Sequence, residues 1–214
     1  MNKEASIQIA MDFIKKWERL GSKSRSGGSY SPEQAKTLPL DTILYSFPDG
    51  RGYSIGWGSY DKLPDGTKVT ANTTITKAKA DEFHEFAVRD TIIPVIDKLI
   101  TRPLTENQYA TLISFAYNAG PYALNYNNLA GVINSGGDVE SVLKKTATKD
   151  SGSGKVLTGL LNRRKDEAKL WDGSYNELYS YYLRNSSNIN YGFIILIGVG
   201  LAFYIKYLKK KNIV

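Results

Sequence analysis

The feature that most constrains this chain lies near its C-terminus, where a long apolar segment follows a polar body. From Asn185 to Ile205 no charged residue occurs, and residues 191–208 read YGFIILIGVGLAFYIKYL, with Lys206 as the single charge. As a helix rising about 1.5 Å per residue, this segment would extend about 27 Å, which is close to the thickness of the hydrocarbon core of a bilayer. Because it lacks a polar face for water, we predict a transmembrane helix over 191–208; a buried core helix is the alternative.

The residues around this segment are consistent with a membrane span. Lys206 lies near its end, where a long side chain can reach the interface, and Lys209 to Lys211 begin a basic tail over 209–214. The lysine cluster predicts that the C-terminus lies on the cytoplasmic side. Residues 174–190 are then a linker, and residues 1–173 form the body of the protein.

Composition limits the chemistry that the body can perform. The chain has no Cys and one His, which excludes disulfides, thiolate nucleophiles, Cys-ligated zinc and sites built from several His side chains. Of the net charge of +7, residues 174–214 contribute +4, from five Lys and Arg against one acid, so the body carries only +3. Such a balance suits a polyanionic partner such as a cell wall or nucleic acid, but it is more often a solubilising surface.

The first half of the body combines one helix with a small sheet. Apolar residues at steps of three and four predict an amphipathic helix over 5–20. Residues 21–36 are rich in Ser, Gly, Lys and Arg without apolar periodicity, which predicts a mobile surface loop. Residues 42–47 and 53–57 are expected to form a hairpin across the turn PDGRG, with a third short strand over 67–71.

Beyond residue 74 the pattern becomes helical. Pro94 is expected to break or kink one helix, and Thr105 with Gln108 forms a capping box before the next. Asp138 can cap a further helix, and the segment LTGLLNRRKDEAKLW has the pattern of an amphipathic helix. The predicted fold class is therefore α+β, with a hairpin sheet followed by a mainly helical lobe.

Three motifs in this order are typical of a known family. The segments GYSIGWG, LTENQYATLISFAYNAG and GLLNRRKDEAKLW follow a helix that ends in Glu. The chain resembles the phage-type lysozymes, glycoside hydrolase family 24, over residues 7–172. The resemblance implies a lysozyme-like fold of two lobes, with a saccharide cleft between them, that cuts the glycan strands of bacterial peptidoglycan. Residues 21–43 read as a loop insertion in this pattern.

Cleavage of a glycosidic bond requires two carboxyl groups and no metal. One carboxylic acid protonates the leaving oxygen, and one carboxylate acts near the anomeric carbon or its attacking water. The resemblance implies that Glu18, at the end of the first helix, is the general acid. Asp49, in the hairpin turn, is expected to face it across the cleft, and Ser54 matches the family's Thr that positions the attacking water.

The sequence departs from the family around the second carboxylate. The interval from Glu18 to Asp49 is 31 residues because of the insertion, and Asp49 lies five residues before Ser54, one fewer than in the family. An Asp before Gly is also a common turn former. Ser59 occupies a position where the family usually has His, and Asp61 is an alternative carboxylate.

The resemblance also implies a set of substrate-binding residues: Trp57, Gln108, Asn118 and Arg163. Trp57 is expected to serve both the core and a sugar, whereas capping and helix termination are alternative roles for Gln108 and Asn118. Arg163 is expected to order charges between the lobes, with its neighbour Arg164 solvated. The single histidine, His84, is expected on the surface of a helix.

Together these features predict a membrane-anchored phage muramidase. The virion membrane is the expected location, with the host inner membrane as the alternative. An inverting mechanism would place the carboxyl groups of Glu18 and Asp49 about 6.5 to 9.5 Å apart. A lytic transglycosylase, and a catalytically inactive wall-binding or structural virion membrane protein, are the alternative functions. No metal, cofactor or nucleic acid is expected.

Overall fold

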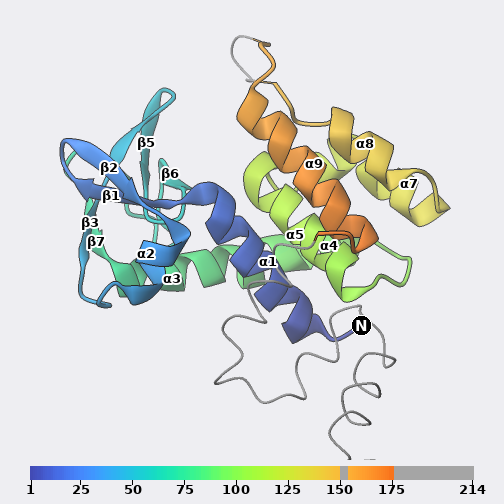
Figure 1. Cartoon of the computed structure of the whole chain (residues 1–214), viewed down its shortest axis with the longest axis horizontal. Coiled ribbons are helices and arrows are strands. Elements are labelled where there is room, and N and C mark those ends of the chain that lie inside the picture. The colour runs from blue at the N-terminus through green and yellow to red at the C-terminus, as the bar shows by residue number, and fades with distance from the viewer. Residues whose placement is uncertain (150–153, 176–214) are drawn as a thin grey trace, which may run out of the picture.

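The computed structural model describes residues 1–149 and 154–175, which form a small sheet lobe and a larger helical lobe (Figure 1). The predicted transmembrane helix over 191–208, the basic tail and the linker beyond residue 175 lie outside the described residues. Within the described ranges, no helix has both the length and the apolar character needed to cross a membrane.

The first helix, α1 (Lys3–Glu18), begins two residues before the predicted start and ends two residues before the predicted end. The side chain of Asn2 accepts a hydrogen bond from the backbone N–H of Ala5 at 3.1 Å and caps the first turn. The apolar stripe of α1 packs on α5, and its last residue is Glu18. The predicted amphipathic helix is thus confirmed.

The sheet lobe contains three small antiparallel sheets rather than one hairpin. The three-stranded sheet has the order β4-β5-β6, and the other two are the pairs β1-β2 and β3-β7. The strands are β1 (Leu20–Ser24), β2 (Gly27–Tyr30), β3 (Ile43–Tyr45), β4 (Phe47–Asp49), β5 (Gly52–Ile55), β6 (Ser59–Tyr60) and β7 (Thr74–Thr76).

The prediction of a mobile loop over 21–36 is wrong. These residues form most of the β1–β2 hairpin and the short helix α2 (Pro32–Thr37). Ser31 begins α2 with a complete capping box, in which its hydroxyl and the side chain of Gln34 satisfy each other's backbone N–H groups. The abundant serines therefore make local hydrogen bonds and do not mark an unstructured segment.

The predicted hairpin is confirmed only in part. Its turn joins β4 to β5, but the first arm over 42–47 is divided, because β3 pairs with β7 and only Phe47 reaches β4. The predicted third strand over 67–71 is also wrong. Lys68 makes one isolated bridge to Lys62, and the third strand of the sheet is β6.

The helical half follows the predicted pattern closely. Thr105 and Gln108 form the expected capping box at the start of α5, and Asp138 caps α8 by accepting from the N–H of Ser141 at 3.0 Å. The helices are α3 (Lys77–Phe86), α4 (Ile93–Leu99), α5 (Glu106–Ala119), α6 (Ala123–Tyr126), α7 (Leu129–Ser135), α8 (Val139–Lys145) and α9 (Thr158–Asp172).

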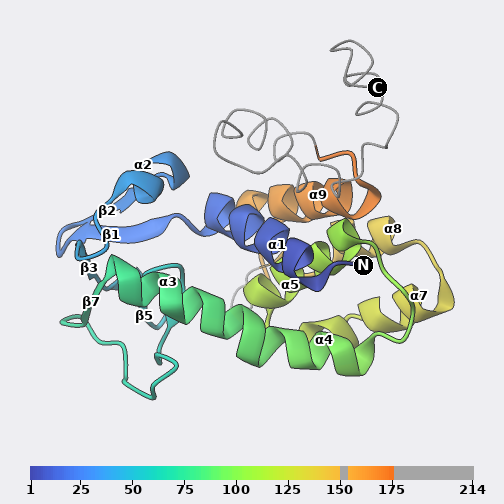
Figure 2. The same cartoon turned by 90° about the horizontal axis from the view of Figure 1, so that it is seen from below.

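One long helical rod connects the lobes. The π-helical segment η1 (Ala87–Ile92) joins α3 to α4, so the chain continues through Pro94 as one rod (Figure 2). Proline has no N–H for the bond to the preceding turn, and the wider turn of η1 lies directly before it. Pro94 therefore does not end the helix.

Each lobe has its own apolar core. The core of the helical lobe is formed by buried residues of α1, η1 and α4 to α9, with Phe13 and Phe115 among them. The core of the sheet lobe contains Trp57, Ile55 and Phe83. Because the cores are separate, groups at the junction of the lobes lie between two packed bodies.

Candidate active site

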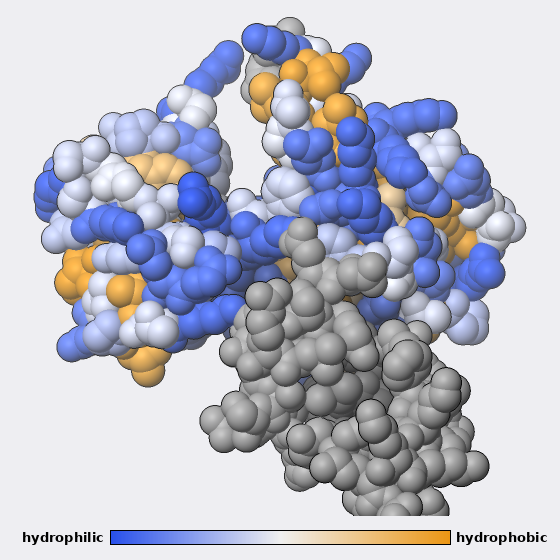
Figure 3. All heavy atoms as spheres, in the orientation of Figure 1, coloured by the Kyte–Doolittle hydropathy of each residue, from blue (hydrophilic) through white to orange (hydrophobic). Residues whose placement is uncertain are grey.

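The two lobes are separated by a notch in the space-filling view (Figure 3). Helix α1 ends between the sheet lobe and α9 (Figure 1), and Arg19, with a φ of 47°, turns the chain out of the helix toward β1. The helix thereby places the carboxylate of Glu18, its last residue, at the junction of the lobes.

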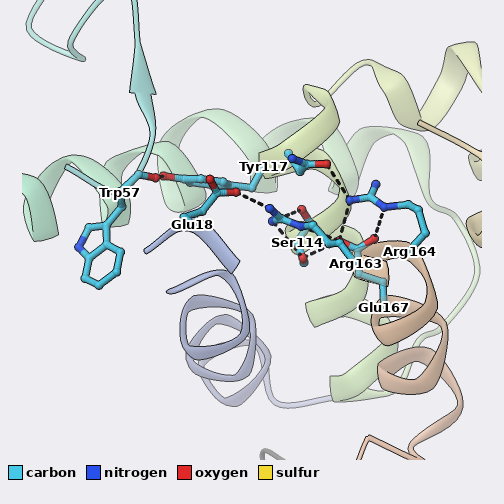
Figure 4. A network of polar contacts seen from close by, with 8 residues as sticks. Glu18, Trp57, Ser114, Tyr117, Arg163, Arg164 and Glu167 are labelled. Carbon is cyan, nitrogen blue, oxygen red and sulfur yellow. Dashed lines mark hydrogen bonds and ion pairs between the residues drawn. The ribbon is translucent and has the colours of Figure 1, made fainter. Parts of the chain in front are cut away.

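Glu18 contacts both lobes. Its side chain is 20% exposed, and its Oε1 atom forms an ion pair with Nη1 of Arg163 on α9. Its Oε2 atom lies 3.1 Å from the point where a Cβ atom on Gly58 would stand, in the turn between β5 and β6. Figure 4 shows the carboxylate pointing toward Arg163, with Trp57 on the opposite side. The predicted Glu18 and Arg163 are therefore brought together.

Arg163 is itself held by a buried carboxylate that sequence reasoning did not single out. Glu167 is fully buried, and its Oε1 atom lies 3.3 Å from Nε of Arg163 and accepts from the hydroxyl of Ser114 at 2.7 Å. Its Oε2 atom forms an ion pair with Nε of Arg164 at 3.0 Å. Burial raises the pKa of the Glu167 carboxyl, and the two guanidinium groups oppose that rise.

The prediction that Arg164 is solvated is wrong. Its side chain is fully buried, its guanidinium lies 4.7 Å from the centroid of the Phe115 ring, and Nη2 donates to Oδ1 of Asn118 at 2.8 Å. Burial lowers the pKa of Arg164 to about 10. Asn118 is thus bonded to Arg164, and its contact with substrate stays a prediction.

Asp49 and Ser54 meet on the three-stranded sheet. Asp49 pairs with Gly52 across a two-residue turn in which Gly50 has a φ of 57°, a conformation that favours glycine. The hydroxyl of Ser54 donates to Oδ2 of Asp49 at 2.6 Å. Asp49 is exposed, whereas Ser54 is buried. The hairpin therefore presents a carboxylate to solvent and fixes its orientation with a neighbouring hydroxyl.

The same sheet face carries an aromatic residue that sequence reasoning missed. Tyr60 pairs with Ser54, and residues paired across antiparallel strands share a face. Its ring lies over Gly52, because a Cβ atom there would stand 2.9 Å from the tyrosine hydroxyl, and the residue is 49% exposed. Tyr60 is identified by the register of β5 and β6, which could not be predicted from the sequence. Asp61, the alternative carboxylate, follows as an exposed residue with a φ of 59°.

The indole of Trp57 belongs to the core of the sheet lobe. It is 3% exposed, and its Nε1 donates to Oδ1 of Asp81 at 2.7 Å. Burial opposes ionisation of Asp81, but hydrogen bonds from Lys77 and Trp57 outweigh it and lower the pKa of Asp81. The backbone carbonyl of Trp57 accepts from the hydroxyl of Tyr117 at 2.7 Å, which joins the lobes beside Glu18.

Gln108 lies at the other end of α5 and serves its first turn. Its Oε1 atom accepts from the backbone N–H of Thr105 at 3.0 Å, and its own N–H donates to the threonine hydroxyl at 3.3 Å. This geometry gives Gln108 a capping role. Its contact with substrate stays a prediction.

The surface position predicted for His84 is wrong. The imidazole is 1% exposed, with its centroid 5.1 Å from that of Tyr117 and 6.0 Å from that of Trp57. Burial, with the nearby charge of Lys15, lowers the pKa of His84 to about 3. Burial and the charge of Glu18 raise the pKa of the Tyr117 hydroxyl, which also favours its neutral form. Both rings lie neutral at the junction of the lobes.

This arrangement offers two separate carboxylates, one at the junction of the lobes and one in the β4–β5 hairpin of the sheet lobe. Glu18 lies against an arginine, and Asp49 lies against a hydroxyl. Among the described residues, no group of three or more His, Asp and Glu side chains is arranged to hold a metal ion. The chemistry that these groups can supply is proton transfer.

A helical lobe and a small antiparallel sheet lobe with a carboxylate at their junction define a lysozyme-like α+β fold. The sequence model of the phage lysozyme family matches residues 40–167, more than half of the chain. The chain therefore belongs to the phage lysozyme family. The matched segment contains Asp49, Ser54 and Arg163 but begins after Glu18.

Relatives and solved structures agree with this family. The chain is 32% identical over 133 residues to the endolysin of Bacillus phage B103, which covers 62% of this chain and 48% of that protein. It is 30% identical over 129 residues to the endolysin of Lactococcus phage c2, covering 56% and 47%. The chain spans about half the length of these curated relatives.

Two solved structures share the fold. The endolysin from Escherichia coli O157:H7 phage FAHEc1 aligns with a TM-score of 0.59 at 24% identity, covering 77% of this chain and 90% of that one. The muramidase domain of SpmX from Asticaccaulis excentricus aligns with a TM-score of 0.52 at 25% identity, covering 76% and 93%. Both alignments extend over most of the described residues.

Proposed function

We propose that this protein is a muramidase that hydrolyses the glycan strands of bacterial peptidoglycan. The observation that carries the proposal is the carboxylate of Glu18 at the junction of the lobes in a phage lysozyme fold, with a second carboxylate, Asp49, on the hairpin of the sheet lobe. Glu18 is held by Arg163, and Asp49 is held by Ser54. The endolysin relatives and the solved muramidase domain support the same activity.

In this mechanism Glu18 gives its proton to the glycosidic oxygen as the bond to the anomeric carbon breaks. Asp49 accepts a proton from the water that attacks the opposite face of the sugar, which inverts the anomeric centre. The hydroxyl of Ser54 donates a hydrogen bond to Asp49 and so keeps the carboxylate in one orientation. Tyr60, half exposed on the same sheet face, offers its ring to an adjacent sugar.

The experiment combines product analysis with one substitution. The full-length chain is incubated with purified peptidoglycan, and the released fragments are analysed by mass spectrometry. Hydrolysis yields reducing muramic acid ends, whereas anhydro-muramic ends would identify a lytic transglycosylase. Glu18→Gln should abolish release while the protein unfolds at a similar temperature. Full release by a folded Glu18→Gln protein would contradict the proposal and favour a wall-binding or structural protein.

The proposal includes a membrane anchor formed by residues 191–208. Its support is the sequence alone: an apolar segment long enough to cross a bilayer, followed by Lys209 to Lys211. We place the anchored enzyme in a phage virion membrane, with the host inner membrane as the alternative. Fractionation of purified virions and of infected cells, with and without detergent, tests the anchor. Release of the full-length chain into the soluble fraction without detergent contradicts it.

A further inference from the structure

Arg163 lies between two carboxylates. Its Nη1 atom pairs with Oε1 of Glu18, and its Nε atom lies 3.3 Å from Oε1 of Glu167 (Figure 4). The Arg163 side chain is 4% exposed and Glu167 is fully buried, so these groups interact with little screening by water. The strength of the ion pair between Arg163 and Glu18 must therefore depend on the interaction between Arg163 and Glu167.

Glu167 is fixed in place from two other directions. The hydroxyl of Ser114 on α5 donates to its Oε1 atom at 2.7 Å, and Arg164 contacts both oxygens, at 3.0 and 3.1 Å. Nη2 of Arg163 also donates to the Ser114 carbonyl at 3.4 Å. This set of contacts anchors the guanidinium of Arg163 with one edge toward Glu167 and the other toward the junction of the lobes.

We propose that Glu167 is a positioning residue that shares Arg163 with Glu18 and thereby keeps the general acid of the proposed muramidase from being held too firmly in its ionised form. The inference rests on the proposed function. Glu167 touches no reacting atom in this scheme and acts only through Arg163.

The direction of the effect follows from electrostatics. Among the described residues, Glu18 and Arg163 interact with Arg164 and Glu167 of α9 and with Tyr117 of α5, and the sheet lobe brings the backbone of Gly58 close to Glu18. If Glu167 becomes neutral, Arg163 pairs with Glu18 alone and a neighbouring like charge disappears. Both changes favour the ionised form of Glu18, which cannot protonate the leaving oxygen.

The test is the pH profile of kcat/KM on peptidoglycan, measured with the full-length chain. Glu167→Gln should move the alkaline limb to lower pH, by about one unit, because the limb reports ionisation of the general acid. Arg163→Gln should move it to higher pH, because the cation that favours the ionised form is gone. These opposite signs distinguish charge sharing from a general loss of structure.

Asp166→Asn is the matched control, since Asp166 is the preceding residue on α9 and forms its ion pairs with Lys16 and Lys169. It should leave the limb in place. If Glu167→Gln fails to fold, Glu167→Asp carries the test, because a carboxylate drawn back by one methylene should shift the limb in the same direction by less. An unmoved limb in a folded Glu167 variant overturns the inference, and an inactive wild-type chain overturns the proposed function instead.

Discussion

The Oε2 atom of Glu18 lies 3.1 Å from the point where a Cβ atom on Gly58 would stand, so this glycine leaves room for the proposed general acid. Gly58→Ala should therefore displace the carboxylate and lower kcat by about tenfold or more. Gly66→Ala is the control, because Gly66 has a similar φ, 88° against 95°, and no atom within 4 Å. Both substitutions carry a backbone strain of about 1 kcal/mol. Equal activities of the two variants would show that the contact with Glu18 is unimportant.

Asp49→Asn should reduce kcat by about 10² to 10⁴, the usual contribution of a general base. Ser54→Ala should cost about tenfold, because it removes one hydrogen bond to a charged group. Asp65→Asn, at an exposed turn where the carboxylate accepts from the N–H of Thr67, serves as the control. Initial rates on purified peptidoglycan measure all three. If Asp61→Asn abolishes turnover while Asp49→Asn does not, Asp61 is the base.

Tyr60→Ala should raise KM for glycan fragments several-fold and leave kcat within about twofold, because a stacking surface binds substrate and transition state alike. Tyr60→Phe should behave like the wild type. Tyr126→Ala, which removes an 85% exposed ring from α6, should change neither constant. Steady-state kinetics on soluble fragments determines kcat and KM separately. An unaltered KM for Tyr60→Ala would show that Tyr60 does not bind the substrate.

Acid should destabilise the fold through His84. The folded pKa of His84 is about 3, below the ordinary value of 6.5, so the unfolded chain binds the proton first and stability falls as pH drops below 6.5. Between pH 7 and pH 5 this one group should cost about 2 kcal/mol of the free energy of unfolding. His84→Phe should remove that part of the pH dependence. Urea titrations at both pH values measure the free energy of unfolding. An equal loss in the wild type and in His84→Phe would show that the histidine is not the cause.

Much of the fold could be predicted because its signals are local. The caps at Thr105 and Asp138 and the turn at Gly50 depend on neighbouring residues, and the structure has them as expected. The pairing of β3 with β7 joins segments about thirty residues apart, and no local pattern specifies it. The helix after Ser31 did carry a signal, the sequence SPEQ, but the surrounding serines and glycines obscured it.

The site divides in the same way. Glu18 and Arg163 could be predicted from the order of the motifs, although their contact joins residues 145 positions apart. Glu167 could not, because a carboxylate four residues after an arginine on a helix usually marks an exposed pair. Only the packing of α9 on Ser114 of α5 makes it a buried group. The burial of His84 could not be predicted for the same reason, because its own helix does not indicate that Trp57 and Tyr117 pack against it.

The number of residues in the rod formed by α3, η1 and α4 affects how the two lobes are rotated relative to each other. Each residue added to or removed from a helix turns everything beyond it by about 100°. The π-helical segment Ala87–Ile92 has a wider turn than an α-helix, so it fixes the phase with which the sheet lobe faces the helical lobe. Deletion of one residue there would keep every side chain of the site but would rotate the hairpin of the sheet lobe away from its present orientation relative to the helical lobe.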